Sequence, residues 1–96
     1  MGRWGHKIMK TYTIYIGSNN ATKQLELDKI NKICSDNHDG FTLYTATGHW
    51  LGSEEATAVV VIHDNPAKIH ETIDNLKTEL YQDAIGYQIS PTLQFA

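Results

Sequence analysis

Hydrophobic and polar residues alternate near the start of the chain, over residues 10–17. Tyr12, Ile14 and Ile16 fall on one side of this alternation, and threonines and a tyrosine fall on the other. A period of two with β-branched and aromatic residues is typical of a strand. We therefore expect a first strand here, followed by a turn at residues 17–20, where Gly, Ser and Asn gather.

Apolar residues recur at helical spacing within residues 22–37, with Lys, Asp and Glu opposite them. The apolar positions are Leu27, Ile30 and Cys34, with Ile33 beside them. This pattern predicts an amphipathic helix. Asn20 or Thr22 can cap its start. We expect residues 38–40 to end it, because Gly40 tolerates the positive φ that is common after a helix.

A second helical pattern follows the Asp-Asn-Pro sequence at residues 64–66. Pro66 suits the first position of a helix, where its missing N–H would have no partner. The apolar residues that follow are spaced by four, three and four positions: Ile69, Ile73, Leu76 and Leu80. We expect a helix of about four turns with a narrow apolar stripe.

Three more strands are predicted after the first one, at residues 41–47, 56–63 and 84–89, because these segments are rich in strand-forming residues. We expect a short fifth segment at residues 93–95. The segment at 56–63 contains four consecutive apolar residues, so both of its faces are apolar. A strand of that kind is usually central in its sheet. Residues 48–55, between the first two segments, are expected to form a loop.

The predicted order of elements is strand, helix, strand, strand, helix, strand. The simplest packing of this order is an α+β sandwich in which a four-stranded antiparallel sheet carries both helices on one face. Right-handed crossovers place the first and third strands in the centre of the sheet. The topology of residues 10–95 resembles the ferredoxin-like superfold and, within it, small regulators of the PII-like kind.

The other face of this sheet carries no helix in the prediction. It would present Thr13, Tyr15, Thr42 and Tyr44, together with either Thr57, Val59 and Val61 or Ala58, Val60 and Ile62 from the third strand. Small monomers rarely expose a large semi-apolar patch. We expect this face to pack against another copy in a symmetric homo-oligomer. The alternative is an open, solvated sheet, which threonine and tyrosine tolerate.

The composition is that of a single folded domain. Of 96 residues, 41% are hydrophobic and 20% are charged, as in globular proteins. We expect residues 1–9 to form a flexible leader and residues 10–96 to form the domain. No apolar run approaches the roughly 18 residues of a membrane span, and the first residues lack the apolar segment of a secretory signal. A single cysteine, which permits no internal disulfide, favours the cytoplasm.

The charge balance argues against nucleic acid as a partner. The net charge is −3, whereas nucleic-acid binding depends on neutralising phosphates. The only arginine, Arg3, lies in the expected leader, so the domain has none of the planar cations that usually grip phosphates and carboxylates. No cofactor motif is present in the sequence, and we expect no cofactor.

The loop at residues 48–55 concentrates the distinctive side chains of the chain. Its candidate binding residues are Gly48, His49, Trp50, Gly52, Glu54 and Glu55, joined by Tyr15 and Tyr44 of the bare sheet face. An imidazole and two carboxylates suit a divalent cation, but their spacing matches no metal motif, and a solvated acidic tip is the favoured interpretation. Trp50 either closes the small core or anchors a ligand or partner, and its flanking glycines favour a shaped backbone.

Two other features have simpler structural explanations. The turn before the first helix could hold an anion on free N–H groups, with Ser18, Asn19 and Thr22 as further donors. It lacks a phosphate-binding motif, so an ordinary strand-to-helix turn is favoured. Cys34 lies in the apolar stripe of the first helix, where a core role is favoured over a reactive one.

The residues around the loop carry a closer resemblance. The segment Asp39-Gly40-Phe41-Thr42 is followed by the alternation of Gly and Trp at residues 48–52 and then by a glutamate before a Val/Ile strand. This succession resembles a small bacterial and phage domain family of unknown function with the pattern DGFT…GxWxG…E. The PII-like resemblance implies nucleotide binding between subunits. The loop here is shorter than those resemblances imply, and basic residues for phosphate are missing.

These observations favour a non-catalytic regulatory protein, oligomeric, that binds a small molecule at a subunit interface near residues 48–55. The resemblance implies a nucleotide or a signalling metabolite. The alternative is a phage or mobile-element interaction module that blocks a host factor through Trp50 and the sheet edges. An enzyme is a third hypothesis, with His49, His63 or a tyrosine as the acid–base group, but no nucleophile and base stand at a recognisable spacing. His38 and His70 are expected on the surface.

Overall fold

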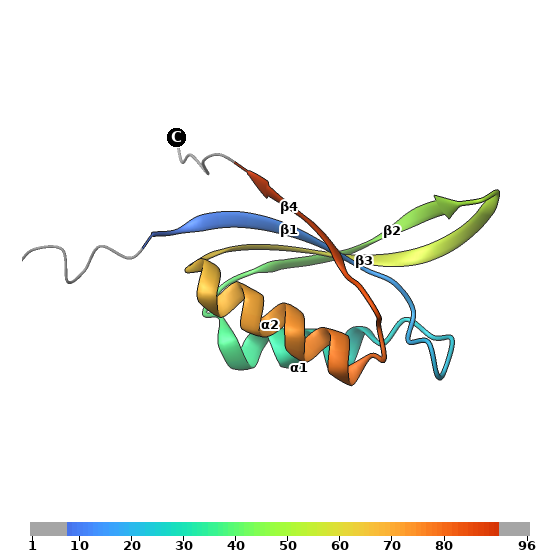
Figure 1. Ribbon diagram of the computed structural model, residues 1–96, viewed down its shortest axis with the longest axis horizontal. Coiled ribbons are helices and arrows are strands. Elements are labelled where there is room, and N and C mark those ends of the chain that lie inside the picture. The colour runs from blue at the N-terminus through green and yellow to red at the C-terminus, as the bar shows by residue number, and fades with distance from the viewer. Residues whose placement is uncertain (1–7, 91–96) are drawn as a thin grey trace, which may run out of the picture.

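The computed structural model describes residues 8–90, whose helices and strands follow the order that the sequence predicts (Figure 1). The elements are β1 (Lys10–Ile16), α1 (Leu27–Asn37), β2 (Thr42–Trp50), β3 (Ser53–Asp64), α2 (Pro66–Glu79) and β4 (Gly86–Ser90). Most of the predicted leader and the predicted segment at 93–95 lie outside the described residues. Within the described range, neither helix is long and apolar enough to cross a membrane.

The four strands form one antiparallel sheet in the order β2-β3-β1-β4. β1 pairs with β3 along its whole length and with β4 on its other side. Both helices lie under one face of the sheet (Figure 1). The predicted ferredoxin-like arrangement is therefore confirmed, with the first and third strands in the centre.

The core lies between this sheet and the two helices. Its buried side chains are Tyr12, Ile14 and Ile16 from β1, Ala58, Val60 and Ile62 from β3, Ile30 and Cys34 from α1, and Ile69, Ile73, Leu76 and Leu80 from α2 and its end. Full burial of one Ile or Leu side chain stabilises a fold by ~1.5–3 kcal/mol. This apolar layer therefore supplies the main driving force for folding.

The second helix begins and packs as the sequence predicts. Asn65 caps it, because its side-chain oxygen accepts a hydrogen bond from the N–H of Ala67 at 2.8 Å. Pro66 takes the first helical position, where no N–H is needed. All four residues of the predicted apolar stripe are buried.

The first helix begins at Leu27 and not at residue 22. The buried side chain of Asn19 holds the preceding residues in a turn, because its Oδ1 accepts the N–H groups of Ala21 and Thr22 at 2.7 and 3.1 Å. Lys23 follows in a left-handed conformation, with φ of 64°. Residues 19–23 therefore form a turn and do not belong to the helix. Leu27 itself is exposed, outside the buried stripe that it was expected to join.

Neither end of α1 carries the predicted cap. Glu26 occupies the position before the helix and makes no side-chain cap bond. Asn20 instead donates from its side chain to the carbonyl oxygen of Tyr81, at 2.7 Å. At the other end the chain leaves the helix through an extended His38, so Gly40 is not needed for a left-handed residue and does not have a positive φ.

The strand boundaries differ from the prediction at three places. β2 continues to Trp50, and β3 begins already at Ser53, so both are longer than expected. β4 begins at Gly86, and of the alternating residues Ile85, Tyr87 and Ile89, which the sequence places on one face, only Ile85, just before the strand, is buried. The edge position of β4 explains the difference, because the helices do not fully cover an outer strand.

A polar network joins the ends of α1 and β3 to α2. His38, which was expected on the surface, is only 5% exposed. Its Nδ1 donates to Asp64 Oδ2 at 2.7 Å, and its Nε2 lies 2.7 Å from Thr72 Oγ1. Asn37 donates to Thr72 at 2.7 Å, and the Thr72 hydroxyl donates to the carbonyl oxygen of Lys68. Because buried polar groups without partners are costly, this set of bonds fixes how the helices meet β3.

The same network controls the ionisation of Asp64. Burial removes water from this carboxyl and acts to raise its pKa, but hydrogen bonds from His38 and from the backbone N–H of Asn65 act against that effect. The charges of Lys68, whose Nζ lies 3.8 Å away, and of His38 also lower the pKa. The net result is a pKa of Asp64 below its ordinary value, so the folded state favours the carboxylate.

We expect stability to fall as acid protonates Asp64. Because the folded state has the lower pKa, the stabilisation is complete above the unfolded pKa, about 3.9 for an aspartate, and is lost as the pH falls through the folded value. Asp64→Asn should lower the free energy of unfolding at neutral pH and flatten its acid dependence. Urea unfolding from about pH 7 to about pH 3 measures both effects. Asp83→Asn, at an exposed aspartate, is the matched control, and an unchanged acid dependence in Asp64→Asn would contradict this assignment.

Candidate functional site

The predicted loop at residues 48–55 is almost entirely strand. β2 runs through Trp50 and β3 starts at Ser53, so only Leu51 and Gly52 connect them. Both connecting residues have positive φ, 50° for Leu51 and 81° for Gly52. A two-residue turn of this kind has the twist that the flanking strands require. The loop prediction is therefore wrong, and the candidate binding residues stand on a β-hairpin.

This hairpin extends beyond the rest of the sheet (Figure 1). β1 pairs with β3 only as far as Ala58, opposite Ile16, so within the described chain residues 46–57 form a ribbon of two strands. Most of the side chains described in this ribbon are exposed. A two-stranded ribbon is at best marginally stable alone in water. The projecting hairpin, residues 46–57, is therefore the part of the fold most in need of an outside contact.

Strand alternation separates the polar side chains of the projecting hairpin onto two faces. His49 lies opposite Glu54 on the helix side, with its Nε2 4.0 Å from Glu54 Oε1. Glu55 lies opposite Gly48 on the other side. The two glutamates therefore point in opposite directions. Among residues 8–90, no three His, Cys, Asp or Glu side chains come together as a metal site.

Two glycines shape the hairpin for different reasons. Gly48 has no room for a side chain, because a Cβ placed on it would lie 2.7 Å from Thr57 Oγ1. Gly52 adopts the left-handed conformation that residues with a Cβ avoid. The first glycine thus permits close packing within the ribbon, and the second permits the tight turn.

Leu51 is a contact candidate that the sequence pattern did not single out. It is 88% exposed at the tip and has a left-handed φ, which is uncommon for a branched apolar residue. Turns of this type usually have Asn before the Gly, so a Leu-Gly pair midway between two strands is the signal that could have identified it. A strained, exposed apolar residue beside the backbone of Trp50 points to a contact role for the tip.

The register defines the open face, meaning the side of the sheet without helices. Its residues, apart from those of the hairpin beyond Thr57, are Thr11, Thr13, Tyr15, Thr42, Tyr44, Thr57, Val59, Val61, His63, Gln88 and Ser90. Of the two sets left open for the third strand, the Thr57 set lies here and the Ala58 set lies in the core. Val59 stands between Tyr15 and Tyr44 in one cross-strand row and is only 2% exposed, while both tyrosines are exposed. Two aromatic rings thus flank an apolar strip on this face.

The N–H groups of the turn before α1 have partners within the chain. Asn19 Oδ1 binds those of Ala21 and Thr22, and the N–H of Asn19 itself donates to the carbonyl oxygen of Gln24 at 2.8 Å. The side chain of Asn19 thus occupies the place that an anion would take. An ordinary connecting turn, which the sequence favoured, is what the structure contains.

The remaining sequence candidates have structural surroundings away from the hairpin. Cys34 is buried, and burial raises the pKa of its thiol to about 11, so little reactive thiolate forms at neutral pH. His63 lies near the opposite end of β3, with its Nδ1 2.8 Å from Thr11 Oγ1. His70 is exposed on α2, as expected, with its Nε2 3.2 Å from the Tyr12 hydroxyl.

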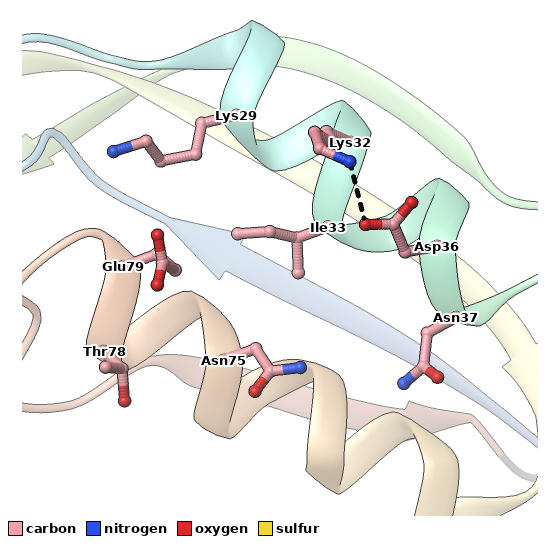
Figure 2. Close-up of a pocket in the computed structure, with 8 residues that line it drawn as sticks. All are labelled: Lys29, Lys32, Ile33, Asp36, Asn37, Asn75, Thr78 and Glu79. Carbon is pink, nitrogen blue, oxygen red and sulfur yellow. Dashed lines mark hydrogen bonds and ion pairs between the residues drawn. The ribbon is translucent and has the colours of Figure 1, made fainter.

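A hollow of about 470 Å³ lies between the two helices (Figure 2). It is lined by Lys29, Lys32, Ile33, Asp36 and Asn37 from α1 and by Asn75, Thr78 and Glu79 from α2. Lys32 pairs with Asp36 at 3.2 Å, and the amide of Asn37 is bound to Thr72. Much of the polar lining therefore already has partners, which leaves the projecting hairpin and the open face as the candidate site.

Comparison with known proteins finds solved structures that share the fold, but it assigns no family to the chain. No protein-family model matches the chain, and no curated protein matches its sequence significantly. A solved DUF3240 family protein from Shewanella baltica is similar, with a TM-score of 0.64 and 17% identity, over 91% of this chain and 93% of that one. A phage SAM lyase in complex with S-methyl-5'-thioadenosine is also similar, with a TM-score of 0.58 and 14% identity, over 85% of this chain and 80% of that one.

Identities this low show a shared fold and do not transfer an activity. The likeness agrees with the ferredoxin-like topology that the order of elements predicts. The resemblance to a family with the DGFT…GxWxG…E pattern stays a prediction, because no family model matches.

We expect the backbone of the tip to control the order of the projecting hairpin. Gly52→Ala places a Cβ in a left-handed conformation and should destabilise the hairpin by about 1 kcal/mol. Leu51→Asn, which suits that conformation, should stabilise it. Hydrogen exchange of the backbone amides in residues 46–57 measures both effects. Gly17→Ala, at a glycine with open space around it, should leave that exchange unchanged. Exchange in Leu51→Asn that is no slower than in the unaltered protein would contradict control of the hairpin by the turn.

Proposed function

We propose that this protein is a non-catalytic binding protein, assembled from identical copies, that holds a nucleoside-like small molecule where the projecting hairpin of one copy meets another copy. The observation that carries the proposal is the hairpin, which leaves the core and exposes both of its faces. The hollow along it, about 340 Å³ in volume, is lined by residues 45–47 of β2 and 54–56 of β3. A second copy would close this hollow into a pocket.

The open face supports assembly from copies. It presents a strip of valine and threonine flanked by Tyr15 and Tyr44, without a lysine, arginine or carboxylate in its four-stranded part. Burial of such a strip is favourable because its apolar area leaves water and few charges lose their hydration. Packing of this face against its equivalent in a second copy is the arrangement that we infer.

The charges of the hairpin narrow the ligand class. β2 and β3 contain no lysine or arginine, and they carry Glu54 and Glu55 near the tip. The negative charges of these glutamates would repel phosphate groups, whereas they would not repel a neutral or cationic nucleoside. S-methyl-5'-thioadenosine, which is bound in the similar phage enzyme, is a nucleoside without phosphate. Tyr44 lies on the same face of the hairpin strands as Ala46 and Glu55, which line the hollow, and supplies an aromatic ring on which a base can stack. Trp50 is the second aromatic residue of β2, near the tip.

A second candidate function is the cleavage of SAM. It is favoured only by the fold shared with the phage SAM lyase. The hairpin offers His49 and Glu54 as an exposed acid–base pair, 4.0 Å apart. Incubation of the protein with SAM, followed by chromatography for S-methyl-5'-thioadenosine, separates this activity from binding without turnover.

We expect assembly to depend on the centre of the open face. Native mass spectrometry at micromolar concentration should show a multiple of the single-chain mass. Val61→Lys puts a charge between Thr13 and Thr42 and should shift the protein to smaller species, because the charge would have to be buried. Asn31→Lys adds the same charge on the exposed side of α1 and should leave the mass unchanged. A single-chain mass for the unaltered protein would end the proposal of assembly.

We expect S-methyl-5'-thioadenosine to raise the unfolding temperature. At a ligand concentration near one hundred times Kd, binding stabilises the folded state by about 2.7 kcal/mol. Tyr44→Ala and Trp50→Ala should each reduce that shift, whereas Tyr81→Ala, at an exposed tyrosine beyond α2, should not. Absence of a shift with this nucleoside, with SAM and with adenosine would exclude the proposed ligand class. Capture of a protein partner together with that absence would favour the interaction-module alternative.

A further inference from the structure

β2 has a second free surface besides its open face, namely the backbone edge that points away from β3. β2 is the outermost strand of the sheet, so among residues 8–90 no strand pairs with this edge. Natural edge strands are usually protected by charges, proline, bulges or short length. β2 has nine residues, TLYTATGHW, with no Lys, Arg, Asp, Glu or Pro, and its register with β3 continues without a bulge. This edge therefore lacks the usual protection against pairing with another strand.

The turn determines which backbone groups face the free edge. A two-residue connection makes its flanking residues, Trp50 and Ser53, a hydrogen-bonded pair. Because bonding alternates along an antiparallel pair, the even-numbered residues of β2 bond to β3 and the odd-numbered residues point outward. The outward N–H and C=O groups are those of Leu43, Thr45, Thr47 and His49.

We propose that this edge pairs with the same edge of a second copy, with the two β2 strands antiparallel about a two-fold axis at Ala46. This register pairs all nine residues of each strand, with Thr42 opposite the second copy's Trp50. It places Thr45 opposite the second copy's Thr47 as a hydrogen-bonded pair, and the outward groups together form about eight bonds. A two-fold contact is self-complementary by construction, and here no charged side chain of β2 faces its equivalent.

The same register places an aromatic ring beside Gly48. It sets Tyr44, which is exposed on the open face, beside the second copy's Gly48. An aromatic ring beside a cross-strand glycine covers the backbone that the glycine leaves bare. Within its own chain, the hydroxyl of Thr57 lies over Gly48 and leaves no room for a Cβ there. The ring of the second copy would approach this glycine from the free edge, where no strand among residues 8–90 lies beside it.

Pairing through β2 would also stabilise the projecting hairpin. Two ribbons side by side form a four-stranded sheet, which is large enough to be stable where a two-stranded ribbon is not. β4, the other edge strand, has five residues and cannot match the nine of β2 within the described chain. The contact uses backbone atoms of the edge, so it is separate from packing of the open face and does not depend on the proposed ligand.

A proline at an outward position tests the contact. Thr47→Pro removes an N–H that faces the free edge and leaves the bonds to β3 intact. Native mass spectrometry should show half the mass of the unaltered protein, with the circular dichroism spectrum unchanged. Thr47→Ala keeps the N–H and should keep the mass. A folded Thr47→Pro variant with unchanged mass would overturn the edge contact, and a lower mass in Val61→Lys alone would then leave the open-face assembly standing.

A charge exchange tests the contact without proline. The Thr45→Lys/Thr47→Lys double variant places like charges opposite each other across the axis and should have half the mass of the unaltered protein. The Thr45→Asp/Thr47→Asp double variant should behave in the same way. An equimolar mixture should restore the mass through mixed pairs. Undiminished mass of either variant alone, or no mixed species, would refute the proposal.

A disulfide tests the register. Ala46 faces its own equivalent across the axis in a non-hydrogen-bonded pair, where the Cβ separation suits a disulfide. Ala46→Cys should therefore form a covalent dimer under mild oxidation, and Thr42→Cys, on the same face of β2 but opposite residue 50, should not. Cys34 is buried and will not interfere. Equal crosslinking of both variants, no crosslinking of Ala46→Cys, or a three-fold mass of the unaltered protein would exclude this two-fold register.

Discussion

The pairing of β1 with β3 is the contact on which the other elements depend. Ile14 lies opposite Val60 near its centre, and both side chains are fully buried. The helices can remove their apolar stripes from water only by packing on these two strands, and each outer strand pairs with one of them. Where this pairing stops, at Ile16 and Ala58, the helical layer no longer supports the sheet, and the hairpin continues without a core.

That transition divides the molecule into a part that is stabilised from within and a part that is not. In the first part, buried polar groups such as His38 and Asn19 are fully used by hydrogen bonds that fix the fold. In the second part, the polar groups and the backbone are open to water or to a partner. Polar and aromatic groups that do not hold the fold together are therefore concentrated on the hairpin, its edge and the adjoining open face.

The two proposed contacts draw on different atoms of the same strand. Packing of the open face uses side chains such as Tyr44 and Val61, and it gains from the removal of apolar area from water. Pairing of the edge uses N–H and C=O groups, and it gains from the saturation of hydrogen bonds. A strand with neutral side chains on its face and no charge at its edge is suited to both contacts. The acidic residues of the hairpin are carried by β3, one strand away from that edge.

The order of elements, the limits of α2 and its buried stripe could be predicted from the sequence, because each depends on periodicity and capping among neighbouring residues. The tertiary structure alone decided which set of β3 residues faces the core, because strand register is a relation between distant segments. The burial of His38 depends in the same way on Asp64 and Thr72, far along the chain. Residues 48–55 contain glycines and charges that resemble a loop locally. They form a hairpin because cross-strand pairing, which no single segment displays, extends both strands to a two-residue turn.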